Sequence, residues 1–160
     1  YESSNKNAFS TSIFYLSGSF DRVTGAGCST NLFYICKTIM KASMIISNVT
    51  QNSIIASDAA LADNFISRLK GLLGTDKLDT GKALIILPCN SIHTFGMKYP
   101  IDVVFLDNHD KVVKINEAMP VNRFALCRKS NYVIELPAGT IEATGTVVGD
   151  KISLKSYSKI

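Results

Sequence analysis

Short runs of apolar and β-branched residues, separated by polar turns, dominate the chain from about residue 44 onward. Residues 54–61 and 83–87 form two such runs, and residues 101–106 form a third that is almost unbroken. Apolar side chains at consecutive positions indicate a strand that is covered on both faces. We therefore predict that 101–106 is a central strand, and that Pro88 ends the strand before it.

Polar turn residues follow this central strand. Residues 107–110, Asp-Asn-His-Asp, are types that tolerate left-handed backbone, and with residues 111–115 they predict a β-hairpin. Two more strands are predicted over residues 132–136 and 151–155. In the second, lysine and serine alternate with isoleucine and leucine, so we expect one wet face.

One segment has the apolar spacing of a substantial helix. Residues 63–73 carry apolar side chains at helical intervals, Asp63 or Asn64 suits the N-cap, and Gly74 suits the end. A shorter helix is predicted near residues 138–144. Because strands come in runs around one main helix, we predict an α+β, mostly β fold with an antiparallel, barrel-like or sandwiched sheet.

The same pattern divides the chain into three parts. We predict a single globular domain over residues 44–155 and a tail over 156–160. Residues 1–43 are rich in serine, threonine and asparagine without sustained periodicity, so we expect a disordered or non-native leader. Met40 or Met44 is then the expected natural start.

An apolar stretch over residues 32–49 raises the question of a membrane anchor. Lys37 and Lys41 interrupt it before it reaches the ~18 uncharged residues that a span needs, so no membrane span is predicted. The apolar run 32–36 is short for a signal peptide, and no small-residue cleavage site follows. We expect a cytoplasmic protein, with the cell envelope or exterior as the alternative.

Composition is that of a soluble globular protein: 46% of the residues are hydrophobic and 19% are charged. The net charge of +4 comes from 17 basic and 13 acidic residues that are interleaved along the chain, so we predict no nucleic-acid binding. Arg123, Arg128 and Lys129 are interpreted as part of a solvated loop, with a shallow anion site as the alternative.

The longest motif in the chain is residues 89–107, CNSIHTFGMKYPIDVVFLD, which resembles the signature of the family called domain of unknown function 192. Three further segments fit that family in order: 68–74 (RLKGLLG), 135–140 (ELPAGT) and 149–150 (GD). The resemblance covers about residues 54–155. It implies a small, mostly β domain of bacteria and archaea without an established activity, often secreted and sometimes associated with pilus or envelope genes.

The chain departs from the family pattern at two positions. Gly96 stands where a bulky aromatic residue is common. At Val121, the residue after a proline, tryptophan is often found in the family. If those aromatic residues line a ligand surface in relatives, the corresponding surface of this member is reduced or altered.

Candidate chemistry gathers in the longest motif. A thiol at Cys89, an imidazole at His93 and a carboxylate at Asp102 could be brought together by a strand, a corner and a second strand. Cys89 as nucleophile and His93 as base would give a hydrolase or transferase. The spacing does not favour that pair, because four extended residues span ~13 Å. Asp102 either pins a loop or has a perturbed pKa, and we expect Glu135 to point outward.

Metal and cofactor sites are not predicted. The four cysteines lack a C-x-x-C pair, and Cys89, His93 and Asp102 have neither a zinc spacing nor an obvious fourth ligand. We instead expect a non-catalytic binding module with a groove formed by residues 89–102 and 119–129. Its ligand would be a small molecule, a glycan or a protein segment, and the sequence leaves the oligomeric state open. The residues expected to contact the ligand are His93, Phe95, Met97, Asp102 and Arg123.

Overall fold

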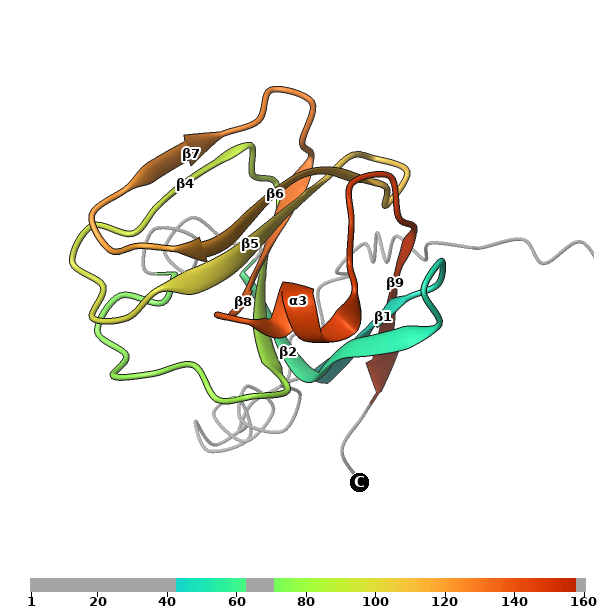
Figure 1. Ribbon diagram of the computed structural model, residues 1–160, viewed down its shortest axis with the longest axis horizontal. Coiled ribbons are helices and arrows are strands. Elements are labelled where there is room, and N and C mark those ends of the chain that lie inside the picture. The colour runs from blue at the N-terminus through green and yellow to red at the C-terminus, as the bar shows by residue number, and fades with distance from the viewer. Residues whose placement is uncertain (1–42, 63–70, 158–160) are drawn as a thin grey trace, which may run out of the picture.

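A computed structural model of the chain describes residues 43–62 and 71–157 (Figure 1). Within these ranges the chain forms strands and one short helix. The elements are β1 (Ser43–Asn48), β2 (Ser53–Ala62), β3 (Lys82–Ile86), β4 (Ser91–His93), β5 (Ile101–Leu106), β6 (Val112–Met119), β7 (Phe124–Leu126), β8 (Tyr132–Pro137), α3 (Thr140–Thr144) and β9 (Ile152–Tyr157).

Seven of the strands form one sheet in the order β6-β5-β8-β3-β2-β1-β9, and β4 and β7 form a separate two-stranded sheet. Neighbours in the large sheet are antiparallel except β2 and β3, which are parallel. A parallel pair needs a crossover connection. The helix predicted over residues 63–73 falls on this connection and lies mostly outside the described residues.

The two edge strands of the large sheet meet at a single point. An isolated bridge joins Lys111 and Lys151, and beside it the Val112 amide donates to the Asp150 carbonyl at 2.9 Å. One bridge does not make a ladder, so the sheet is not closed into a barrel. The predicted α+β, mostly β class is confirmed.

The central strand β5 separates two hydrophobic clusters. Val104 and Leu106 pack into a first cluster that includes Ile141 of α3, and we call this the helix side of the sheet. Ile101, Val103 and Phe105 pack into a second cluster that includes Ile92 of β4 and Ala125 of β7, and we call this the layer side. All six residues of β5 are buried, as predicted for a strand covered on both faces.

The predicted hairpin and short helix are both present. The Asp107 carboxylate accepts hydrogen bonds from the amides of His109 and Lys111, at 2.8 and 3.0 Å, and Asp110 adopts the expected left-handed conformation with φ of 56°. Helix α3 lies inside the predicted 138–144 window. No helix among the described residues has the length and apolarity to span a bilayer.

Strands β4 and β7 were not predicted. Each has only three residues, too few for a period-two pattern to stand out in the sequence. The expected solvated loop around Arg123 and Arg128 therefore needs correction, because β7 lies between these residues. Pairing with β4, which is remote in sequence, creates this strand.

Candidate functional site

The two segments that the sequence singled out lie side by side. Their contact is the antiparallel pairing of β4 with β7, whose register is Ser91 to Leu126, Ile92 to Ala125 and His93 to Phe124. Backbone hydrogen bonds extend the ladder at both ends, from Cys127 to Asn90 and from Thr94 to Arg123. Residues 89–102 and 119–129 are thus joined in one structural unit, which we call the β4–β7 layer.

The layer has one dry and one wet face. Ile92 and Ala125 point inward and are buried in the layer-side cluster. Alternation along a strand then turns His93, Phe124 and Leu126 outward, where all three are exposed. Lys114 of β6 donates to the Leu126 carbonyl at 3.0 Å, which ties β7 to the large sheet.

Three rings are contiguous on the wet face. Asn90 and Thr94 make backbone hydrogen bonds to β7, so His93 and Phe124 face each other without a backbone bond between them. In an antiparallel ladder, the side chains of such a pair are the closest across the strands. The His93 ring also stacks on the Phe95 ring, with 5.5 Å between centroids and 30° between planes. Phe95 is 52% exposed and Phe124 is 62% exposed. We call His93, Phe95, Phe124 and Leu126 the ring surface.

His93, Phe95 and Met97, all expected to contact the ligand, do not lie on one face. Strand β4 ends at His93, and Gly96 adopts φ of 77°, so the chain turns between Phe95 and Met97. Met97 and Tyr99 are half-buried against the layer-side cluster, and the Tyr99 hydroxyl lies 2.5 Å from the Thr75 hydroxyl. The glycine that departs from the family pattern is thus the residue that separates the exposed ring from the buried side chains.

A buried threonine fixes the end of the layer that carries the rings. Thr94 is fully buried, and its hydroxyl donates to the Pro120 carbonyl at 2.7 Å and accepts from the Arg123 amide at 2.9 Å. The Arg123 carbonyl accepts from the Thr94 amide at 2.9 Å. These bonds hold Arg123 beside the ring surface, with its side chain exposed. Sequence reasoning did not single out Thr94.

Asp102 lies apart from the ring surface. It is 1% exposed and points to the helix side of β5. Its two oxygens accept hydrogen bonds from the Ala118 amide at 2.7 Å and the Ile141 amide at 2.8 Å. The carboxylate thereby pins β6 and the start of α3 to the central strand, so it does not converge with His93 and Arg123.

Cys89 and His93 occupy different environments. The Cys89 thiol donates to the Ser91 carbonyl at 3.0 Å and packs, half-buried, against the layer-side cluster, whereas His93 stands on the wet face. Cys127 is likewise half-buried against the layer-side cluster. Among the residues that the structure describes, no group of three or more histidine, cysteine or acidic side chains could hold a metal ion.

Glu135 is a buried acid on the layer side of β8, where the sequence analysis expected an outward side chain. That expectation was wrong because both faces of β8 are covered. Glu135 is 4% exposed, and its Oε2 atom has no hydrogen-bond partner. Burial raises the pKa of this carboxyl from 4.5 to about 7.

A second unpaired acceptor lies in the same row of the sheet. Val103 pairs with Glu135 on one side and with Asn116 on the other, and the Asn116 Oδ1 atom is also buried without a partner. Buried polar atoms are usually hydrogen-bonded. The layer side therefore concentrates unsatisfied acceptors beneath the β4–β7 layer.

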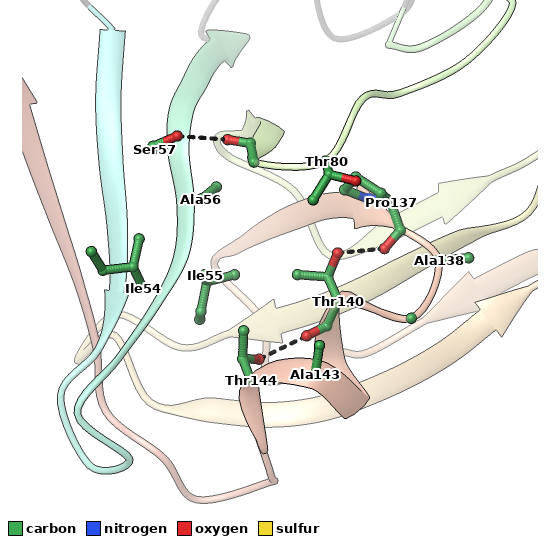
Figure 2. A pocket seen from close by; sticks show the side chains of 12 residues that line it. Ile54, Ile55, Ala56, Ser57, Thr80, Pro137, Ala138, Thr140, Ala143 and Thr144 are labelled. Carbon is green, nitrogen blue, oxygen red and sulfur yellow. Dashed lines mark hydrogen bonds between the residues drawn. The ribbon is translucent and has the colours of Figure 1, made fainter.

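A groove of about 460 Å³ lies on another part of the molecule, between β2, the residues before β3, and α3 (Figure 2). None of its lining residues is charged. Three of its four hydroxyls are engaged: Thr140 donates to the Pro137 carbonyl at 2.7 Å, Thr144 to the Thr140 carbonyl at 2.8 Å, and Ser57 to the Gly81 carbonyl at 3.5 Å. The groove offers a ligand shape but few free polar groups.

Comparisons with known proteins agree with this fold. Curated relatives include a UPF0127 protein from Pyrococcus furiosus, 33% identical over 110 residues that make up 66% of this chain and 93% of that protein. Another, from Pyrococcus horikoshii, is 34% identical over 113 residues, 68% of this chain and 96% of that protein. Both organisms are archaea.

Two solved bacterial structures have the same fold. A protein of unknown function from Novosphingobium aromaticivorans superposes with a TM-score of 0.61 at 18% identity, covering 69% of this chain and 83% of that one. A putative transcription regulator from Sinorhizobium meliloti gives 0.61 at 19% identity, covering 74% of this chain and 95% of that one. The family model DUF192 (Uncharacterized ACR) matches residues 46–154. The resemblance found in the motifs is thereby confirmed, and the chain belongs to the DUF192 family.

Proposed function

We propose that this protein is a non-catalytic binding module whose contact surface is the ring surface. The observation that carries the proposal is the contiguous, exposed set of His93, Phe95 and Phe124 rings on a paired and anchored layer. Exposed apolar patches rimmed by polar residues mark interaction sites in soluble proteins. Aromatic rings contribute a large contact area at a small cost in side-chain entropy.

The anchoring of the layer supports binding further. Ile92 and Ala125 hold it to the core from beneath, and Thr94 fixes its end through hydrogen bonds. A surface that is already ordered loses less conformational entropy when a ligand binds. The fitting ligand classes are a small molecule, a glycan and a protein segment. The alternative of a cysteine-dependent hydrolase receives less support, because the Cys89 thiol bonds to a carbonyl on the dry side.

Ligand-observed NMR tests the proposal and does not require the ligand to be identified first. A library of small aromatic, sugar and dipeptide fragments would be screened by saturation transfer from the native protein. Phe124→Ser is the informative variant, and Val148→Ser is its matched control, because these two side chains are 62% and 60% exposed. We expect Phe124→Ser to lose most hits and Val148→Ser to keep them. Equal hit lists for both variants would remove the basis of the proposal.

Two further proposals concern the chain as a whole. We propose that residues 44–155 act as one domain, since seven of the described strands over this range share one large sheet and the other two pack on it through the layer-side cluster. We also propose a cytoplasmic location, with the cell envelope or the exterior as the alternative, because the free thiol of Cys127 suits a reducing compartment. Fractionation of native cells checks the location, and recovery with the envelope or the medium would contradict it.

A further inference from the structure

The β4–β7 layer carries an unusual share of the charge of the protein. Residues 89–100 and 119–131 contain four basic residues and no acidic residue, and the one acidic residue of the layer, Asp102, is buried on the helix side of β5. Their formal charge of +4 equals the net charge of the whole chain, so the remaining residues sum to zero. Interleaving of charges along the sequence hid this, because the two segments meet only in the fold.

Most of this positive charge is not neutralised within the protein. Lys98 is paired with Asp76 across 2.5 Å. Arg123, Arg128 and Lys129 are exposed and form no salt bridge with another described residue. One unpaired guanidinium beside the exposed rings, at Arg123, and two more unpaired cations in the turn after β7 favour an anionic partner through charge complementarity.

The outer edge of β4 offers backbone groups as well. Because the inter-strand bonds fall at Asn90 and Thr94, the amides and carbonyls of Ser91 and His93 point away from β7. The Ser91 carbonyl accepts the Cys89 thiol. Among the described residues no strand pairs with this edge. An extended peptide can add to such an edge through main-chain hydrogen bonds.

These observations discriminate between anionic partners. Phosphate-backbone binding draws on many cations along a track, whereas three are free here. Sugar recognition draws on several hydrogen-bonding side chains, whereas His93 is the one member of the ring surface that has such a side chain. An extended peptide uses all three features: its backbone meets the β4 edge, its apolar side chains meet the His93 and Phe95 rings on that strand, and its negative charge is attracted by the unpaired cations of the neighbouring β7 segment.

We propose that the partner of the ring surface is an extended acidic protein segment with apolar side chains at alternate positions, bound along β4. This inference rests on the proposed binding function and names its ligand class. Alternation fits because successive side chains of a strand point to opposite faces, so every second residue can reach the rings.

Fluorescence anisotropy of the full-length protein with three labelled probes tests the inference. The probes are the heptapeptide EIEFEIE, its lysine counterpart KIKFKIK and a ten-nucleotide oligothymidylate. We expect the acidic peptide alone to bind, and to bind more weakly as salt increases. Arg123→Glu should weaken it by about fivefold or more, because an attractive charge becomes repulsive. Lys155→Glu, a matched reversal on β9, should leave the affinity unchanged.

Each other outcome has a defined meaning. Equal binding of the lysine peptide, lost in Phe124→Ser, would overturn the acidic preference and leave the binding function standing. Tighter binding of the oligothymidylate, lost in Phe124→Ser, would assign the surface to nucleic acid instead. Absence of acidic-peptide binding would overturn the inference, and fragment hits that still depend on Phe124 would preserve the proposed function.

Discussion

Buried polar groups on the two sides of the large sheet differ in how fully they are hydrogen-bonded. On the helix side, each buried carboxylate is well supplied with hydrogen bonds: Asp102 receives two backbone amides, and Asp150 receives the Asn48 amide group at 2.8 Å and the Val147 amide at 2.9 Å. On the layer side, Glu135 and Asn116 each keep a buried oxygen without a partner. The helix side is built for stability, and the layer side gives up some stability beneath the proposed contact surface.

Removing the Asp102 carboxylate should give the largest effect. Asp102→Ala leaves the amides of Ala118 and Ile141 without their acceptor in the core. We expect the free energy of unfolding to fall by about 4 kcal/mol, since each bond to a charged group contributes about 1.5–3 kcal/mol. Urea denaturation measures it. A loss below about 1 kcal/mol would mean that the helix side is not stabilised in this way.

Removing the charge of Glu135 should have the opposite effect on stability: it should stabilise the protein at alkaline pH. The pKa of Glu135 is raised to about 7 in the folded protein, so the folded state retains a proton that the unfolded state releases near 4.5. Stability is therefore greatest below about pH 4.5 for this group and falls as pH rises through 7. A raised pKa of this size corresponds to about 3 kcal/mol.

The substitution Glu135→Gln isolates this contribution. The variant should be more stable than the native protein at pH 8 by up to about 3 kcal/mol, and the difference should shrink towards pH 5. Leu84 and Val103 are its direct cross-strand neighbours, and Lys114, at the cluster edge over the Phe105 ring, is retained in the variant. Thermal unfolding across this pH range measures the effect. If the native protein and Glu135→Gln change in stability by the same amount between pH 5 and pH 8, the carboxyl of Glu135 is not buried and unpaired as described.

Thr94 should matter less than Asp102, because its bonds are between neutral groups. Thr94→Val keeps the shape but removes the bonds to Pro120 and Arg123. We expect a loss of about 2 kcal/mol, at about 1 kcal/mol for each neutral hydrogen bond. Amide exchange should quicken in residues 91–94 and 121–126 before it quickens in β5. Uniform acceleration throughout the sheet would show that the layer is not a separate unit.

The smallest effect on stability belongs to the ring surface. Phe124→Ser removes an exposed side chain, so the free energy of unfolding should change by less than about 0.5 kcal/mol. Chemical denaturation checks this, with Val148→Ser as the control. A loss comparable with that of Thr94→Val would mean that Phe124 serves the core and not a partner.

Long-range pairing explains which features the sequence could predict. The unbroken run at residues 101–106 and the turn residues after it are local signals, and β5 and its hairpin were predicted correctly. β4 and β7 are three-residue strands that exist because of each other, so neither could be recognised alone. The position of Glu135 also depends on strands far away in the sequence that cover both faces of β8.

The candidate residues show the same limit. The sequence drew attention to residues 89–102, but the fold divides this segment: His93 and Phe95 lie on the wet face of the layer, while Asp102 lies on the helix side. The turn at Gly96 and the return of the chain into β5 cause this division. The position of Arg123 and Phe124 next to His93 could not be read from the sequence, because it depends on the β4–β7 pairing.

Protein-observed NMR most directly tests whether the layer side carries the function. Amide shifts of the native protein would be mapped during titration with the fragments that bind. Our expectation is that the largest shifts fall on residues 91–95 and 123–126, with little change around Ile54 and Thr140 in the groove between β2 and α3. Shifts concentrated in that groove, with the layer unmoved, would contradict it.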